Sequence, residues 1–141
     1  MTPSNADIKK RKAGKRMIKC PENELITIEK GELLSRCMEM KKSGLRLSQA
    51  CAAFCDGNYE LSYSFADDET YEYKTLRLPE GLDEEIPSIT DIIPTAVFSE
   101  NEMAEMYGVK IQMISLDYHN KLYRIEEEAP LLPKDAKSTA Q

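Results

Sequence analysis

Residues 50–78, ACAAFCDGNYELSYSFADDETYEYKTLRL, carry the pattern of three consecutive β-strands. Four apolar side chains in the middle of this stretch alternate with polar ones: Tyr59, Leu61, Tyr63 and Phe65. Such an alternation is typical of a strand with one buried face. Turn-forming residues at 56–58 and 66–70 separate it from an apolar run before it and from a second alternating stretch after it. We therefore predict an antiparallel β-meander.

A helix is predicted on each side of the meander. The first covers residues 32–42, with Leu33, Leu34, Cys37 and Met38 on one face, and follows a short β-prone run at 25–28. The second runs from Thr95 to Tyr107 and ends at Gly108. The predicted fold class is therefore α+β: a strand and helix, then the meander, then a C-terminal helix packed on or beside the sheet.

The chain of 141 residues suits one domain, predicted at 24–125, between a basic flexible arm at 1–23 and a flexible tail at 126–141. Residues 1–19 contain seven basic side chains and one acidic, whereas the remainder contains 12 basic and 24 acidic. So acidic a body should repel phosphate, and we expect no nucleic-acid partner. We also expect no transmembrane span and no secretory signal peptide.

Few side chains could support catalysis or bind a metal. Cys20, Cys37, Cys51 and Cys55 lack the paired spacing of a zinc or iron–sulfur site, and we interpret them as small buried hydrophobes. His119 is the only histidine, which excludes a two-histidine metal site. Phosphate-loop and nucleophile-elbow motifs are absent. We expect no catalytic residue, no metal and no cofactor in this chain.

Residues 86–109, IPSITDIIPTAVFSENEMAEMYGV, are more specific. They resemble the signature of the 30 kDa (C) subunit of respiratory complex I. The matching positions are Pro87, Ser88, Ile89, Ala96, Phe98, Glu100, Glu102, Glu105, Met106, Tyr107, Gly108 and Val109. Asn101 stands where that family usually has arginine, and the Gly-His-Pro and Arg-rich continuation is missing. The shorter form is most similar to the corresponding subunit of energy-converting, membrane-associated [NiFe]-hydrogenases.

The resemblance implies a subunit that binds no cofactor and docks on the hydrogenase-like large subunit, near iron–sulfur subunits. The complex would lie on the cytoplasmic face of the membrane and couple electron transfer to ion translocation. The implied partner-binding residues are Pro87, Ser88, Phe98, Glu100, Glu102, Met103, Glu105, Tyr107 and Gly108. Phe98, Met103 and Tyr107 would be apolar anchors, and the glutamates would pair with cations of the partner. Phe98 and Met106 could instead cover the chain's own sheet.

Two other classes of function remain open from the sequence. The basic arm could make the chain a stand-alone binding module for RNA or an acidic partner. The four cysteines could make it a small thiol redox or metal protein.

Overall fold

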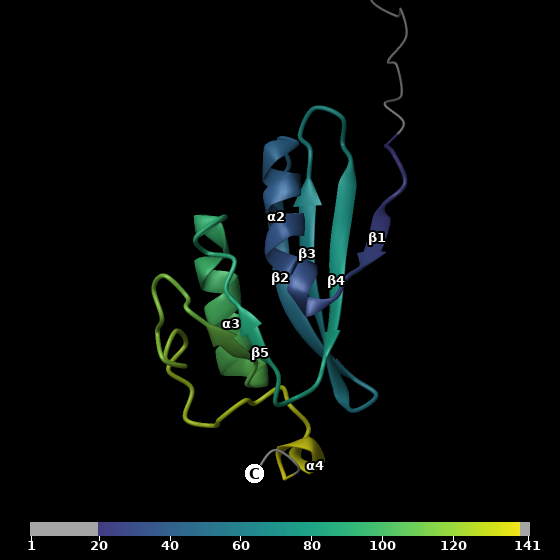
Figure 1. Cartoon of the computed structure of the whole chain (residues 1–141). Helices are drawn as coiled ribbons and strands as arrows, with labels where there is room; N and C mark the ends of the chain where they lie inside the picture. Colours follow the sequence, from purple (N-terminus) through teal and green to yellow (C-terminus); the bar gives the residue numbers. More distant parts are fainter. Residues whose placement is uncertain (1–19, 139–141) are drawn as a thin grey trace, which may run out of the picture.

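The computed structural model describes residues 20–138, and its largest element is a four-stranded sheet. Strands β2 (Arg46–Cys55), β3 (Asn58–Ala66) and β4 (Tyr73–Glu80) form the predicted antiparallel meander. Strand β1 (Glu24–Thr27) pairs with β4 in parallel, so the strand order is β1-β4-β3-β2 (Figure 1). The predicted fold class, α+β with a meander between two helices, is confirmed.

The alternation along β3 sets which face of the sheet is buried. All four apolar side chains predicted to face inward are at most 3% exposed: Tyr59, Leu61, Tyr63 and Phe65. In the adjacent strand, Leu76 pairs with Tyr63 and Leu78 pairs with Leu61, and both leucines are fully buried. The register thus stacks apolar side chains from neighbouring strands on one face, which is the main stabilising unit of a sheet.

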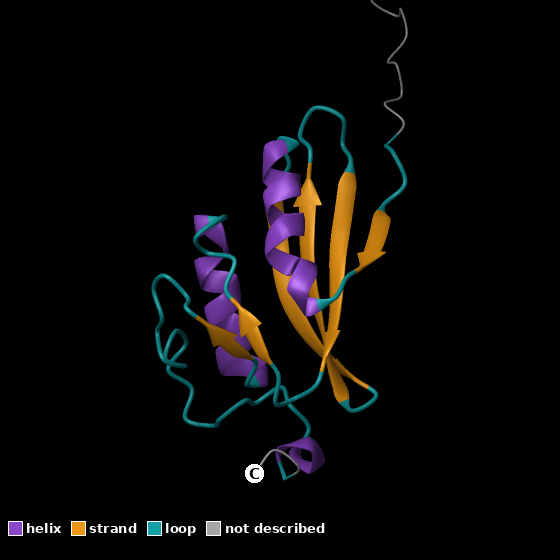
Figure 2. Ribbon diagram, in the orientation of Figure 1, coloured by secondary structure: helices purple, strands orange, loops and turns teal. Residues whose placement is uncertain are grey.

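Helix α2 (Leu33–Lys42), which follows the 3-10 turn η2 (Lys30–Glu32), packs on this apolar face (Figure 2). Its buried side chains are Leu33, Cys37 and Met40. Leu34 and Met38, which we predicted on the same face, are 39% and 45% exposed. The helix is rotated so that positions i, i+4 and i+7 face the sheet, and the adjacent apolar positions lie at the edge of the contact.

A second group of elements follows the large sheet. Strand β5 (Glu85–Pro87) pairs in parallel with β6 (Lys110–Gln112), and between them lie η3 (Pro94–Ala96) and helix α3 (Val97–Tyr107). Helix α3 contacts β2, at the edge of the four-stranded sheet (Figure 1). Gly108 ends the helix with φ +74°, as predicted from its position.

Residues 126–138, the described part of the tail predicted to be flexible at 126–141, pack against the body in the structure. Leu132 is 8% exposed, and the N–H of Leu131 donates to the carbonyl of Met106. A short helix, α4 (Lys134–Lys137), follows. Leu132, which lies between Pro130 and Pro133, supplies the apolar contact that the polar composition of this segment obscured. The predicted arm at 1–23 lies outside the described residues for all but its last four positions.

The cysteines do not all behave as predicted. Cys37 is buried in the core, but Cys51 is half-buried and Cys20 and Cys55 are exposed. Within the described part of the chain, no three histidine, cysteine or acidic side chains are placed to hold a metal ion. None of the described helices combines the length and the apolar character needed to cross a bilayer.

Candidate partner-binding site

Glu100 ties helix α3 to the segment that precedes it. Its side chain is fully buried; Oε1 accepts the N–H of Ile89 at 2.8 Å, and Oε2 accepts the hydroxyl of Ser88. Thr90 extends this network, because its hydroxyl contacts that of Ser88 and accepts the N–H of Ser115 at 2.9 Å. Two segments that enclose the helix are therefore joined through Glu100 and its neighbours.

The surroundings of Glu100 are apolar enough to affect its ionisation. Burial raises the pKa of Glu100, and the hydrogen bonds from Ile89 and Ser88 oppose that effect. Burial also raises the pKa of the Cys37 thiol to about 12, and the negative charge of Glu100 adds to the shift. Tyr63, whose hydroxyl has no hydrogen-bond partner within residues 20–138, has its pKa raised first by burial and then by Glu100. The carboxyl group thus belongs to the interior of this chain.

Asn101 holds the loop that follows β6. Its Nδ2 donates to the carbonyls of Val97 and Leu116, at 2.7 and 2.9 Å, and its Oδ1 accepts the N–H of Tyr118 at 2.9 Å. The side chain is 2% exposed. An amide suits this position because it presents donors and an acceptor together, whereas arginine has donors only. The sequence showed Asn101 only as a departure from the family pattern, and this structural role was missed.

Glu105 holds the same loop one helical turn further on. Its Oε2 accepts the N–H of Tyr123 at 2.9 Å, and Oε1 is 3.4 Å from the N–H of Ile125. The side chain is 4% exposed and makes no ion pair within residues 20–138. Both oxygens are therefore directed at the backbone of this chain. Cations on a partner could reach Glu105 only if these hydrogen bonds were broken.

Asn101 and Glu105 lie on one face of α3 with Phe98, whereas Glu102 borders the hollow between the helix and β2. The loop that they hold, residues 113–125, runs along this face on the side of α3 away from the four-stranded sheet (Figure 2). Four residues of this loop have positive φ: Met113, His119, Asn120 and Arg124. Such conformations are unfavourable for most residues other than glycine, and the hydrogen bonds from α3 to Leu116, Tyr118 and Tyr123 hold the backbone between them.

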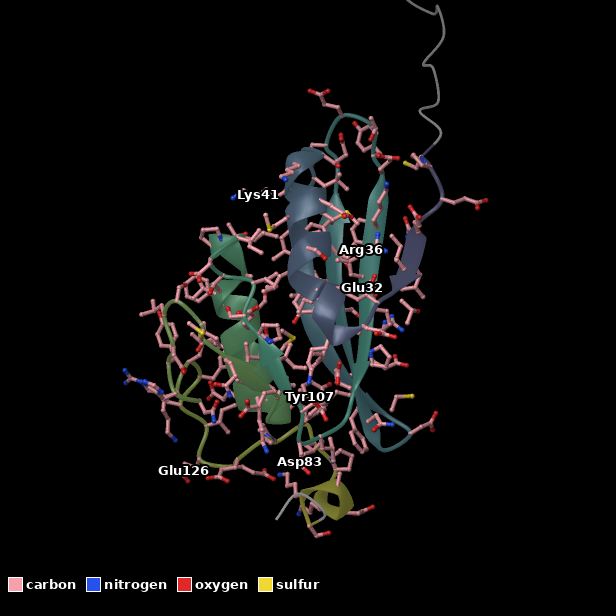
Figure 3. The ribbon with its side chains drawn as sticks, in the orientation of Figure 1. Glu32, Arg36, Lys41, Asp83, Tyr107 and Glu126 are labelled. Atoms are coloured by element: carbon pink, nitrogen blue, oxygen red, sulfur yellow. The ribbon has the colours of Figure 1, made fainter. Side chains whose placement is uncertain are left out.

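The structure divides the predicted partner-binding residues into three groups. Glu100, Met103 and Glu105 are buried in the chain itself. Pro87, Ser88, Tyr107 and Gly108 are half-buried, and Tyr107 lies at the end of α3 close to the large sheet (Figure 3). Phe98 and Glu102 are exposed. Met103, 2% exposed, fills the space between α3 and the sheet and is not an accessible anchor in this structure.

Phe98 is joined at the surface by side chains that sequence reasoning did not select. Its ring centroid lies 6.4 Å from that of Tyr118, which belongs to the loop 113–125. In the same loop Met113 is 84% exposed, Leu116 55% and Tyr123 52%, against 58% for Phe98. We call the loop 113–125 together with Phe98 the loop surface. Several large apolar side chains in one exposed segment are a feature of protein–protein contact sites.

Together the fold and the site define a small α+β protein with a loop, rich in exposed apolar side chains, that is fixed to one helix. The model of the family "Respiratory-chain NADH dehydrogenase, 30 Kd subunit" matches residues 26–127. The chain belongs to this family.

One solved structure supports the fold independently. The chain is similar to a chain in the structure of the membrane-bound sulfane sulfur reductase (MBS), described as an archaeal respiratory membrane complex. The two share 19% sequence identity with a TM-score of 0.69, and the match covers 92% of this chain and 82% of that chain. At this identity the similarity concerns the fold. A comparison with curated proteins gives no match.

Proposed function

We propose that this chain is a docking subunit of a membrane-associated redox complex and binds the hydrogenase-like large subunit of that complex. The observation that carries the proposal is the family match over residues 26–127, together with the exposed apolar loop surface beside the family signature. The role of the chain is to complete the hydrophilic arm on the cytoplasmic face of the membrane. There it supports electron transfer coupled to ion translocation, and neighbouring iron–sulfur subunits carry the electrons.

Within this proposal, the exposed signature residues serve the contact and the buried ones do not. Glu100, Asn101 and Glu105 act within the chain, where they fix the segments around α3. Phe98 and Glu102 are left to meet the partner, with Tyr107 and Gly108 shaping the end of the same helix. This division explains why a surface helix carries polar residues that are fully buried. The buried residues fix the backbone of the loop surface, and the exposed residues make the proposed contact.

The proposal is tested by titrating the purified chain with the purified large subunit in a calorimeter. Phe98→Asp places a charge in the proposed contact and should weaken binding at least tenfold, which corresponds to about 1.4 kcal/mol. Leu25→Asp is a matched control, because Leu25 is 59% exposed on β1, away from α3. It should leave affinity unchanged. Absence of binding by the wild-type chain would contradict the proposed function.

A further inference from the structure

We infer that the loop surface recognises a partner surface that is apolar at its centre and carries carboxylates at its edge. The inference rests on the proposed function, and it names the chemistry of the patch that the large subunit must present. Signature glutamates in the sequence suggested the opposite, a partner that supplies cations. Because Glu100 and Glu105 are buried, Glu102 is the one signature glutamate exposed to pair with a cation of the partner.

The loop contains more basic than acidic side chains. Residues 113–125 hold two basic side chains, Lys121 and Arg124, against one acidic side chain, Asp117. Residues 20–112 and 126–141 hold ten basic and 23 acidic side chains. The loop itself therefore carries a net charge of +1 on a strongly acidic body, and Glu127 and Glu128, which follow it, line the same hollow as Lys121. A complementary partner surface must carry negative charge at this place.

The two cations make no ion pair within the described part of the chain. Lys121 and Arg124 are exposed, and neither makes an ion pair with any residue from 20 to 138. By contrast, seven of the other described cations pair with acidic side chains: Lys30, Arg36, Arg46, Lys74, Arg77, Lys110 and Lys137. Residues 20–141 hold 24 acidic and 12 basic side chains, yet both cations of this one loop are left without an ion pair to residues 20–138.

The position of these cations suits a partner contact. They flank Tyr123, which is 52% exposed, and the backbone of Tyr123 is held by Glu105. Leu116 and Phe98 lie further along the same face of α3, where Asn101 holds the loop. The backbone is fixed before any partner arrives, so ordering it costs little on binding. The apolar side chains form the centre of the patch and the cations its edge.

An anionic membrane is the other surface that cations and aromatic side chains could meet. The acidic body argues against it, because residues 20–112 and 126–141 carry an excess of 13 negative charges, which an anionic leaflet would repel. A protein surface can confine its negative charge to the contact itself. This distribution of charge therefore favours a protein partner with a local acidic edge.

The experiment measures association of the chain with the purified large subunit by biolayer interferometry at low and high salt. Lys121→Glu combined with Arg124→Glu should slow association at least tenfold at low salt. The difference from wild type should shrink as salt screens the charges. The control combines Lys42→Glu with Lys134→Glu. These lysines are also exposed and lie outside the loop, and neither makes an ion pair within residues 20–138.

The outcomes separate this inference from the proposed function. If the wild type binds the large subunit and the loop variant binds it equally fast, the inference is wrong and the proposed function stands. If the wild type does not bind, both fail. Co-sedimentation with phosphatidylglycerol vesicles is measured in parallel. If the loop variant loses vesicle binding and keeps large-subunit binding, the loop is a membrane contact and the inference is overturned.

Discussion

The hydroxyl of Tyr59 donates a hydrogen bond to the main-chain carbonyl of Tyr107 over 2.6 Å. This bond links β3, in the middle of the large sheet, to the last residue of α3. The carbonyl belongs to a helix end, where no further turn supplies a backbone donor. Gly108, the next residue, turns the chain away with positive φ. The position of α3 beside the sheet is thus fixed at the residue where the helix stops.

Tyr59→Phe removes this link and leaves the ring in place. We expect the free energy of unfolding to fall by about 1 kcal/mol, because a partly buried carbonyl loses its donor. Urea denaturation measures the change. Tyr71→Phe is the control, since Tyr71 is 49% exposed, and it should be neutral. Equal stability of the two variants would show that the hydrogen bond does not hold the helix end.

Gly108→Ala should be destabilising for two reasons. Its φ of +74° is unfavourable for alanine, and the added Cβ would lie 3.3 Å from the Cβ of Ala129. We expect a loss of about 1–2 kcal/mol in the free energy of unfolding. Gly31→Ala is a matched control, because no atom lies within 4 Å of its added Cβ and its φ is not positive. A loss at Gly31 as large as at Gly108 would refute the explanation.

Asn101→Ala should release the loop without unfolding the domain. The N–H of Tyr118 and the carbonyl of Leu116 lose their partner, at a cost of about 1–3 kcal/mol for a buried group. Amide hydrogen exchange should therefore speed up at Tyr118, while the strands of the large sheet keep their protection. Glu102→Ala, on the exposed side of the same turn, should leave exchange unchanged. Unaltered exchange at Tyr118 in Asn101→Ala would contradict the assigned role.

The raised pKa of Glu100 predicts a specific dependence of the free energy of unfolding on pH. Because burial raises its pKa, the native state keeps this proton to higher pH than the unfolded state, whose value is near 4.5. As the pH rises from that value through the native pKa, the free energy of unfolding should fall, and above the native pKa the loss is complete.

Glu100→Gln has no proton to lose and should lack this fall. Its stability relative to wild type should therefore improve as the pH rises from about 4.5 towards neutrality. Urea denaturation across this pH range tests the expectation, with Glu102→Gln as an exposed control. A constant difference between wild type and Glu100→Gln at all pH values would show that Glu100 ionises normally.

The sheet could be predicted from the sequence because its information is local. The alternation from Tyr59 to Phe65 fixes which side chains face inward, and the turn at 56–58 fixes the pairing of β2 with β3. Gly108 likewise marks the end of α3 by its own conformational freedom. The parallel pairing of β1 with β4 could not be read in the same way, since it depends on contacts about 50 residues apart.

The candidate site was predicted less well because its polar residues bond to distant backbone. Glu100, Asn101 and Glu105 look like a charged, solvated face, yet their partners are the N–H groups and carbonyls of loops. No side-chain pattern reveals which backbone groups lack a partner. Lys121 and Arg124 lie in an irregular segment without a motif, so only the structure shows that they flank exposed apolar side chains.

The central claim is that the loop surface, residues 113–125 with Phe98 of α3, forms the contact with the large subunit. Hydrogen–deuterium exchange on the chain alone and in the assembled complex tests it most directly. The account predicts that binding protects amides in residues 113–125 and leaves those of β1 unchanged. Protection confined to β1 and the neighbouring sheet, with loop 113–125 exchanging as in the free chain, would contradict it.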